Sequence, residues 1–482
     1  MARLLWTDPF WNGKRKPFII GVVMSSLSVI VMFFVVMSYL YGSVWRSTHR
    51  ASHLNILAVD YDGGVVGKSL SAGYSALEGD KFPTLHFRSS EEFATVEDIR
   101  NAVCRGDYWA AIFAQNGASD RLSAALGGGA AASGYNSSET LTYVYNEARY
   151  PTVQSSHILS NMQTLIGTAT SIYGSLNGTS AAKFLNTDDA NATLALLNPI
   201  SASSINIMPT PQGTKVLYNT VTLVLPIIQQ FFFLLALNGI STHFGIYGYL
   251  SSLHVGLIRM VVAISYTFLA SLTLVGYIWA FKEDWGVSGG QFVLTWMAMW
   301  LYMHVNFLVL DAATAFVPLA YLSFFVLPWA IINITSTIFP FELSPGFYKL
   351  GYALPGHQVV SMLFQIWSGG CNNELSRSLP VLFAWEIFGW VVSGWGVVYR
   401  NRAAREEVLK EEADARKPPQ TSSTSNTQEV QEKPNPELEN LRRKIERRNT
   451  GPPGLPMPFQ GMYLLVEDGG ELGLYNVKDK RT

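Results

Sequence analysis

The sequence has few charged residues, and they are unevenly placed. Of its 482 residues, 14% are charged, against about 25% in ordinary globular proteins. The segment from Val216 to Tyr399 holds only ten charged side chains, whereas the shorter segment 400–482 holds 29. A water-soluble core of that length cannot be so poor in charge. The composition therefore excludes a soluble globular protein and indicates a membrane protein.

The sequence also has few cysteines and almost no net charge. Cys104 and Cys371 are the only cysteines, which excludes a disulfide-dense scaffold and a multi-thiolate metal site. The formal net charge of −1 leaves no basic excess for nucleic acid and no acidic field for cationic partners. The sequence also lacks a nucleophile, metal or acid–base constellation, so we predict no enzyme activity, no metal and no cofactor.

Six segments are long and apolar enough to cross a bilayer as helices, which takes about 20 mostly apolar residues each. The first, Phe18–Tyr41, contains no charge and follows three basic residues. Because it is longer than a signal-peptide core and lacks a good cleavage site, we interpret it as a retained anchor. Asp311 marks the predicted break between the fourth and fifth spans. The remaining five spans are predicted at Val216–Gly239, Leu257–Phe281, Gln291–Leu310, Ala313–Ile338 and Leu379–Tyr399.

Basic residues on both flanks of these spans predict the orientation. Lysine and arginine precede the first span and follow the last, at Arg400, Arg402 and Arg405, and such residues stay in the cytosol. The sequence therefore predicts a multi-pass protein of the plasma membrane or an endomembrane. Residues 1–17 and 400–482 are expected in the cytosol, the anchor at 18–41, and residues 45–215 outside.

Three glycosylation triplets agree with this orientation, because all of them lie within residues 45–215. They begin at Asn136, Asn177 and Asn191, and such triplets accept sugars in secreted or external segments. A fourth triplet, at Asn333, lies inside the fifth predicted span, where no transferase could reach it. We therefore predict a glycoprotein whose sugars lie on the external segment.

The external segment alternates strand and helix signals. Apolar runs at Leu54–Val59, Tyr108–Phe113 and Leu141–Tyr145 are typical of strands, and Ala118–Leu126 is typical of a helix that ends at three glycines. We expect a small α/β domain here. The weakly helical stretch 150–185 is interpreted as a stalk that leads back to the bilayer.

A glycine-rich turn follows the first of these strands. It contains Asp60, Asp62, Gly63, Gly64 and Gly67, and with the Lys-Ser pair after it the stretch looks like a phosphate-binding loop. That motif needs four residues between its first glycine and the Gly-Lys pair, and Asp62 stands where the first glycine should be. We therefore interpret the stretch as a turn between a strand and a helix.

Both cysteines fall on the predicted external side. A disulfide between Cys104 and Cys371 is chemically allowed in an oxidising compartment. Two unrelated free thiols fit the sequence as well, because sequence shows no proximity. The sequence leaves the pairing open.

Several motifs in order resemble the fungal nitrosoguanidine-resistance membrane proteins. They are Val59–Gly67, Gly106–Ile112, Tyr145–Tyr150, and, near the end, Glu342, Pro345, Phe347-Tyr348 and Gly351–Pro355. The similarity covers residues 16–400. This family is in turn similar to the YhgE/Pip phage-infection proteins and to ABC-2-type exporter membrane domains. The resemblance implies one span, a large external domain and then five spans, together with an association with resistance to toxic small molecules. It supplies no catalytic residues.

Polar side chains at bilayer depth are costly and are functional candidates by default. His304 and Asn306 lie in the fourth predicted span, Asn333 in the fifth and Glu386 in the sixth. One hypothesis is a polar seam that binds a solute or passes protons, with His304 and Glu386 as titratable partners. The other is hydrogen bonding between helices, typically about 1 kcal/mol or less per pair. The sequence does not decide between them.

Two connections and the tail bear on the architecture. Residues 339–380 are apolar, too short to cross and interrupted by glycine, which predicts a re-entrant external loop at a place where ABC-2-type domains carry short half-helices.

The cytosolic loop Ile240–Gly256 is where such a fold would contact a partner ATPase, but its shortness and near lack of charge argue against that docking. Residues 400–482 mix 15 basic with 14 acidic residues, which predicts a mostly disordered tail. Its first part, the mixed-charge run Arg402–Arg416, is compatible with a helix that continues the sixth span.

The sequence thus predicts an α-helical membrane protein of ABC-2-like architecture, with one plus five transmembrane helices and an external α/β domain between the first and second. The leading hypothesis is support of resistance to toxic small molecules, by export of amphiphiles or lipids or by a change in the membrane. The alternative is a membrane-anchored receptor or scaffold whose external domain binds a partner. The expected partners are the bilayer and a small amphiphilic substrate, with no nucleic acid. A homodimer, the substrate and the energy source are left open.

Overall fold

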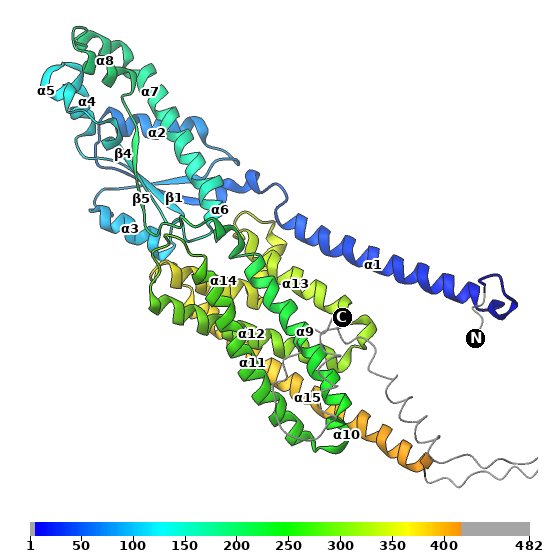
Figure 1. Cartoon of the computed structure of the whole chain (residues 1–482). Coiled ribbons are helices and arrows are strands. Elements are labelled where there is room, and N and C mark those ends of the chain that lie inside the picture. The colour runs from blue at the N-terminus through cyan, green and yellow to red at the C-terminus, as the bar shows by residue number, and fades with distance from the viewer. Residues whose placement is uncertain (1–4, 416–482) are drawn as a thin grey trace, which may run out of the picture.

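The protein is mostly helical and carries one small sheet at one end of a helix bundle (Figure 1). The structure, a computed structural model, describes residues 5–415. Within them, six helices are long and apolar enough to cross a membrane, as the sequence predicts. They are α1 (Arg15–Ser43), α9 (Val221–His243), α11 (Ser252–Ala280), α12 (Gly289–Phe316), α13 (Ser323–Ile338) together with the 3-10 turn that precedes it (Leu319–Tyr321), and α15 (Leu375–Ala415).

The boundary between the fourth and fifth spans is not where the sequence places it. Helix α12 continues through Asp311 to Phe316, and the break comes at Val317 and Pro318. Asp311 does not interrupt the helix because its carboxylate is paired with arginines of neighbouring helices. Pro318 does, because proline has no backbone N–H and disfavours a helical residue before it.

Helix α15 is longer than the predicted sixth span. It begins at Leu375, so the last part of the expected loop 339–380 is already helical, and it continues beyond Tyr399 to Ala415. The start of the expected disordered tail, from Arg400 to Ala415, is therefore helical. The rest of that tail, residues 416–482, lies outside the described residues.

The α/β domain contains five strands in the order β2-β1-β3-β4-β5. Strand β1 pairs in parallel with β2 and β3, β3 pairs antiparallel with β4, and β4 pairs in parallel with β5. The strands are β1 (Asn55–Asp60), β2 (Thr84–Arg88), β3 (Ala110–Ala114), β4 (Leu141–Tyr145) and β5 (Ala202–Asn206). The sequence predicts β1, β3 and β4, whose runs are apolar because they are buried. It misses the two edge strands, which are only partly buried and more polar.

Helices cover both faces of this sheet. Side chains of β1 alternate between the faces: Ile56 packs towards α2 (Val65–Leu77) and Leu57 towards α3 (Val96–Arg105), as the period of two in a strand requires. Helix α4 (Ala118–Leu126) forms with the predicted bounds. Near it lie α5 (Gly129–Ser133) and α8 (Ala190–Leu197), at the end of the domain far from the bundle (Figure 1).

The prediction of a stalk at 150–185 is wrong. After α6 (Pro151–Val153) and a π-helical stretch at Gln154–Leu159, the chain forms α7 (Ser160–Phe184). This helix runs away from the bundle (Figure 1) and packs against α2 in the α/β domain. The chain returns to the bundle through β5 and a short 3-10 helix instead. Helix α7 stays with the domain because it packs along α2, and its buried Met162 and Leu165 belong to the apolar cluster that also contains Leu70 of α2.

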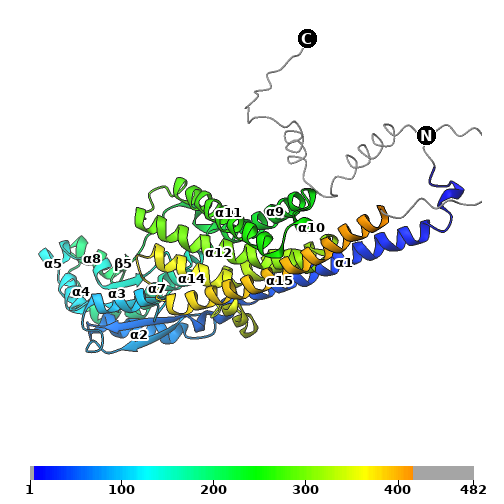
Figure 2. The same ribbon diagram turned by 90° about the horizontal axis from the view of Figure 1, so that it is seen from below.

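A short buried helix lies where the α/β domain meets the bundle. Helix α14 (Pro355–Trp367) packs among α12, α13 and α15, and eleven of its 13 residues are buried. At about 1.5 Å of rise per residue it spans roughly 20 Å, too little to cross a bilayer. In Figure 2, α14 lies near the α/β domain, and α11, α12 and α15 extend away from that domain.

Candidate functional site

A large cavity opens among α11, α12, α14 and α15. Its volume is about 950 Å³, and apolar side chains supply most of its lining. Ligand cavities typically measure about 300–1,000 Å³ and carry a few polar groups that orient the ligand. The apolar lining includes Ile264, Leu294, Met297, Trp300, Leu301, Met362, Leu379 and Phe383.

Two of the predicted intramembrane residues meet in this cavity. His304 from α12 and Glu386 from α15 both line it, with Nδ1 of His304 2.6 Å from Oε1 of Glu386. The same carboxylate oxygen accepts a hydrogen bond of 2.9 Å from the indole N–H of Trp390. The His304 side chain is 7% exposed and that of Glu386 16%. The pair is therefore held in place, largely out of solvent, by contacts among three side chains from two helices.

The outer atoms of this pair have no partner. Nε2 of His304 and Oε2 of Glu386 are buried and form no hydrogen bond with any described residue. The two glutamines that line the cavity, in contrast, form hydrogen bonds with the backbone. Gln291 donates to the carbonyls of Ile366 and Trp367 and accepts from the N–H of Ser288. Gln365 accepts from the N–H of Glu374. Unsatisfied buried polar atoms cost free energy. Because both atoms are fully buried, a ligand in the cavity meets them only when neighbouring side chains shift.

The hydrogen-bonding capacity of the His304–Glu386 pair decides which groups it can bind. With a neutral imidazole whose Nδ1–H donates to the carboxylate, Nε2 and Oε2 are both acceptors and the pair carries one negative charge. A group with N–H or O–H donors, above all an ammonium, then satisfies both atoms.

An aromatic layer closes the cavity on the side away from the α/β domain. The rings of His304 and Trp390 lie 5.2 Å apart, and the ring of His304 is stacked with that of Phe307 at 6.5 Å. Beyond this layer lies a second cavity of about 310 Å³, to which Trp390 and Phe307 also contribute. Trp390 therefore lines both cavities and separates them.

A buried charge cluster at the second cavity is not predicted from the sequence. Asp311, 1% exposed, pairs with Arg259 from α11 and Arg400 from α15, and accepts a hydrogen bond from Ser393. The sequence interpretation treats Asp311 as a helix boundary and passes over Arg259 within the third span. The signal that could have identified Arg259 and Asp311 is a charged residue inside an apolar span, because such a residue is a functional candidate by default.

The other two predicted residues form hydrogen bonds that join helices. Asn306 donates to the carbonyl of Tyr302 and accepts from the indole of Trp329, which joins α12 to α13. Asn333 donates to the carbonyl of Trp329 and accepts from the backbone N–H of Gly356, which joins α13 to the start of α14. The side-chain oxygen of each thus accepts from another helix, the side-chain N–H donates within its own helix, and neither residue lines the large cavity.

The glycine-rich turn after β1 is closed by its own side chains. Asp60 accepts from the N–H groups of Asp62 and Gly63, and Asp62 accepts from Gly64 and from Ser119 at the start of α4. The Ser119 hydroxyl accepts in turn from the N–H of Val66, at the start of α2. A Cβ on Gly67 or Gly64 would overlap these groups. The turn therefore leaves no space for a phosphate and serves to join β1, α2 and α4.

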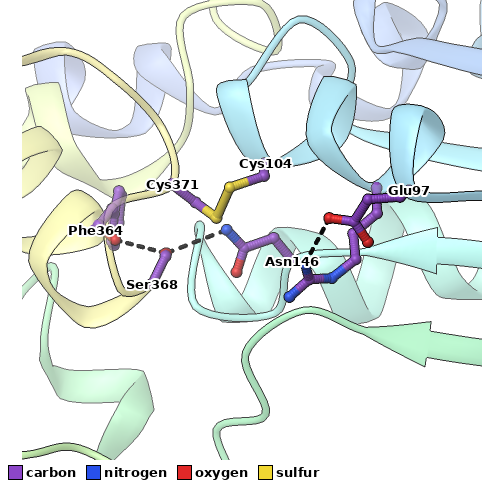
Figure 3. The surroundings of a disulfide bond; sticks show 7 residues. Glu97, Cys104, Asn146, Phe364, Ser368 and Cys371 are labelled. Carbon is purple, nitrogen blue, oxygen red and sulfur yellow. Dashed lines mark hydrogen bonds and ion pairs between the residues drawn. A yellow bond between two sulfur atoms is a disulfide. The ribbon is translucent and has the colours of Figure 1, made fainter.

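A disulfide ties the α/β domain to the bundle. Cys104 at the end of α3 is bonded to Cys371 in the loop after α14 (Figure 3). The structure thus contains the Cys104–Cys371 disulfide, which the sequence alone leaves undecided. Next to it, Asn146 after β4 donates to the hydroxyl of Ser368, and the N–H of Asn372 donates to the carbonyl of Cys104.

This attachment lies beside the large cavity. Gly369 and Gly370, immediately before Cys371, line that cavity and adopt φ values of +68° and +106° that favour glycine. The position of the α/β domain is therefore coupled directly to the cavity wall.

An ion pair forms a second attachment. Nζ of Lys215, just before α9, lies 2.6 Å from Oε1 of Glu147, just after β4. Burial opposes ionisation of Glu147, but the Lys215 ammonium and hydrogen bonds from Thr210 and Asn206 outweigh it, so the pKa of Glu147 lies below its ordinary value. The pair links the sheet to the second span.

The three predicted glycosylation residues all lie on the α/β domain. Asn136 is exposed and caps a short 3-10 turn, accepting from Ser138. Asn191 is exposed near the start of α8, and Asn177 is half-buried in α7. The geometry leaves at least the first two accessible.

Comparison with known proteins places the chain in a family. A family model described as "Protein of unknown function (DUF3533)" matches residues 25–391, well over half of the chain. The chain belongs to this family. The matched region runs from α1 into α15, so it contains the α/β domain, both disulfide cysteines and the His304–Glu386 pair.

One curated relative of this DUF3533 member is the "Uncharacterized endoplasmic reticulum membrane protein YJR015W" of Saccharomyces cerevisiae. The two chains are 30% identical over 122 residues, 24% of each. The chain thus spans about a quarter of the length of that relative. No solved structure matches. The six spans and the membrane-protein relative identify the chain as a multi-pass membrane protein.

Proposed function

We propose that this protein binds amphiphiles with a hydrogen-bond-donating, preferably cationic head group in the large cavity and moves them within or across the membrane. The observation that carries the proposal is an apolar cavity of about 950 Å³ at which two buried polar atoms, on His304 and Glu386, lack partners. An apolar body fits the lining, and the head group fits the pair. Resistance to toxic amphiphiles is the cellular role that this activity would support.

The chemistry of the pair narrows the ligand class. A charge-assisted hydrogen bond in a site shielded from water contributes about 1.5–3 kcal/mol. Neutral amphiphiles can use the acceptors only through a hydroxyl or an amide N–H, and anionic ones are repelled by the carboxylate. We therefore place protonated amines of moderate size ahead of neutral lipids, and both ahead of acids.

The proposed orientation puts the α/β domain outside the cytosol. A disulfide persists in oxidising compartments, and the Cys104–Cys371 bond lies at this end of the bundle, as do the residues Asn136, Asn177 and Asn191. The large cavity then occupies the outer half of the bundle. One anchor, an external domain and five further helices with short α14 support an ABC-2-like architecture.

The first experiment measures binding. Purified protein in detergent micelles is titrated with rhodamine 6G, an amphiphilic cation, and bound dye is followed by fluorescence anisotropy. Glu386→Gln keeps the side-chain shape and the contacts to His304 and Trp390 but removes the charge, so we expect affinity to fall about 10- to 100-fold. Glu374→Gln, on the loop after α14, is the matched control and should leave affinity unchanged. Equal affinity in all three proteins would contradict the proposal.

The second experiment measures movement. Sealed vesicles containing the protein are loaded with the same dye, and its release is compared with and without ATP or a proton gradient. Release by the native protein that Glu386→Gln abolishes supports transport. Dye binding without protein-dependent release under any of these conditions would instead favour a receptor or scaffold role.

A further inference from the structure

The buried charge cluster beside the second cavity contains two guanidinium groups and one carboxylate, and Arg259 and Asp311 of this cluster line the cavity. The guanidinium groups of Arg259 and Arg400 both face the single carboxylate of Asp311. The Arg259 side chain is 5% exposed, Arg400 11% and Asp311 1%. Arg400 does not line the second cavity but a separate one with Glu407 and Glu411, which are exposed and form no ion pair with it. Among the described residues, the cluster thus holds one more positive than negative charge.

Arg259 also has an unused donor. One of its terminal nitrogens donates to the hydroxyl of Tyr247 and the other to Asp311, whereas its Nε is buried and has no partner among the residues that the structure describes. Arg259 lines the second cavity. A buried cation that lacks full compensation is costly, and guanidinium groups bind phosphate and carboxylate well. The arrangement calls for an anion.

The walls of this cavity show what accompanies the anion. Leu253 and Leu257 of α11 line it and are 69% and 48% exposed, so the cavity is continuous with the apolar outer surface of the bundle. An acyl chain can lie along that surface while its head group reaches Arg259. Charge and shape thus favour an anionic amphiphile over a free ion.

We propose that the second cavity, among α11, α12 and α15, is a binding site for an anionic phosphate head group, held by Arg259 and carried by a membrane lipid. The site lies apart from the His304–Glu386 cavity, on the other side of Trp390, and prefers the opposite charge. It therefore stands independently of the function proposed above.

The test uses the full chain in nanodiscs of phosphatidylcholine with and without phosphatidic acid, and counts lipids that remain bound by native mass spectrometry after transfer to detergent. Arg259→Gln leaves Asp311 paired with Arg400, so the cluster becomes charge-balanced and should still fold. We expect retention of phosphatidic acid to fall about 10- to 100-fold in this variant. The control is Arg402→Gln, which removes one positive charge from an exposed residue of α15 close to Arg400. This variant should retain phosphatidic acid as well as the native protein does.

Further arms separate the possible outcomes. Arg259→Lys keeps the charge without the forked donors and should show intermediate retention. If inorganic phosphate at millimolar concentration protects the native protein against thermal unfolding and phosphatidic acid adds nothing, the anion is free phosphate and the lipid assignment is overturned. Equal retention by native protein, Arg259→Gln and Arg402→Gln overturns the site itself. Size-exclusion profiles that match the native protein establish that each variant is folded.

Discussion

Helices α1 and α12 are both membrane spans, yet they relate to the protein in opposite ways. In its most apolar stretch, α1 has 6% of its residues buried within the protein, against 67% for α12. The more apolar helix is thus the more exposed one. Figure 1 shows α1 diverging from the bundle, with α12 inside it. Lipid is as apolar as leucine, so burial of a span comes from packing and polar contacts with neighbouring helices.

Polar residues follow the same division. Helix α12 carries His304, Asn306 and Asp311, each of which contacts another helix. Helix α1 carries serines, and Ser28 satisfies its hydroxyl on its own backbone, at the carbonyl of Met24. In these two helices, a polar side chain that bonds to another helix lies inside the protein. A polar side chain that bonds to its own backbone one turn away gives no information on burial.

The largest expected effect comes from Asp311→Ala. The change leaves Arg259 and Arg400 buried without their carboxylate, so we expect the free energy of unfolding to fall by about 3–5 kcal/mol. Ser28→Ala, on α1, should change it by no more than about 0.5 kcal/mol. Both are measured by titrating the protein in mixed micelles with sodium dodecyl sulfate. Comparable losses in the two variants would remove the distinction between the helices.

A smaller effect is expected from packing. A Cβ on Gly389 of α15 would lie 2.8 Å from Cβ of Leu308 of α12, whereas one on Gly21 of α1 would meet nothing within 4 Å. Gly389→Val should therefore destabilise the protein by about 1–3 kcal/mol. Gly21→Val, which changes helix propensity equally, should have little effect. The same unfolding assay checks both, and a destabilising Gly21→Val would indicate that α1 packs against something in the micelle.

The smallest effect is expected at the ion pair outside the bundle. Because the pKa of Glu147 is lowered in the folded protein, its contribution to stability is complete above the ordinary glutamate pKa of about 4.3 and is lost as the pH falls through the lower folded value. The difference in midpoint between native protein and Glu147→Gln should thus be present at pH 7 and vanish in acid. Glu139→Gln, an exposed residue of the same domain, serves as control. A difference that grows as the pH falls would contradict this assignment.

Different physical signals make different features predictable. The spans follow from apolar length, and His304 and Glu386 are identified because a titratable group in an apolar run stands out. Their contact is not predictable, because they lie on different helices far apart in the chain and sequence carries no distance. Asp311 is assigned wrongly because a single charge between two apolar runs looks like a loop. Its arginine partners, which make it compatible with a helix, become visible only when α11, α12 and α15 are packed together.

The sequence by itself determined that this chain crosses a membrane, how many spans it has and that a sheet-containing domain separates the first from the rest. These properties depend on local composition and period, which each segment carries alone. Only the tertiary structure decided which polar groups share a cavity, that Cys104 and Cys371 pair, and that two cavities lie on either side of Trp390. Those properties depend on contacts between residues far apart in the chain, whose energies no local pattern records.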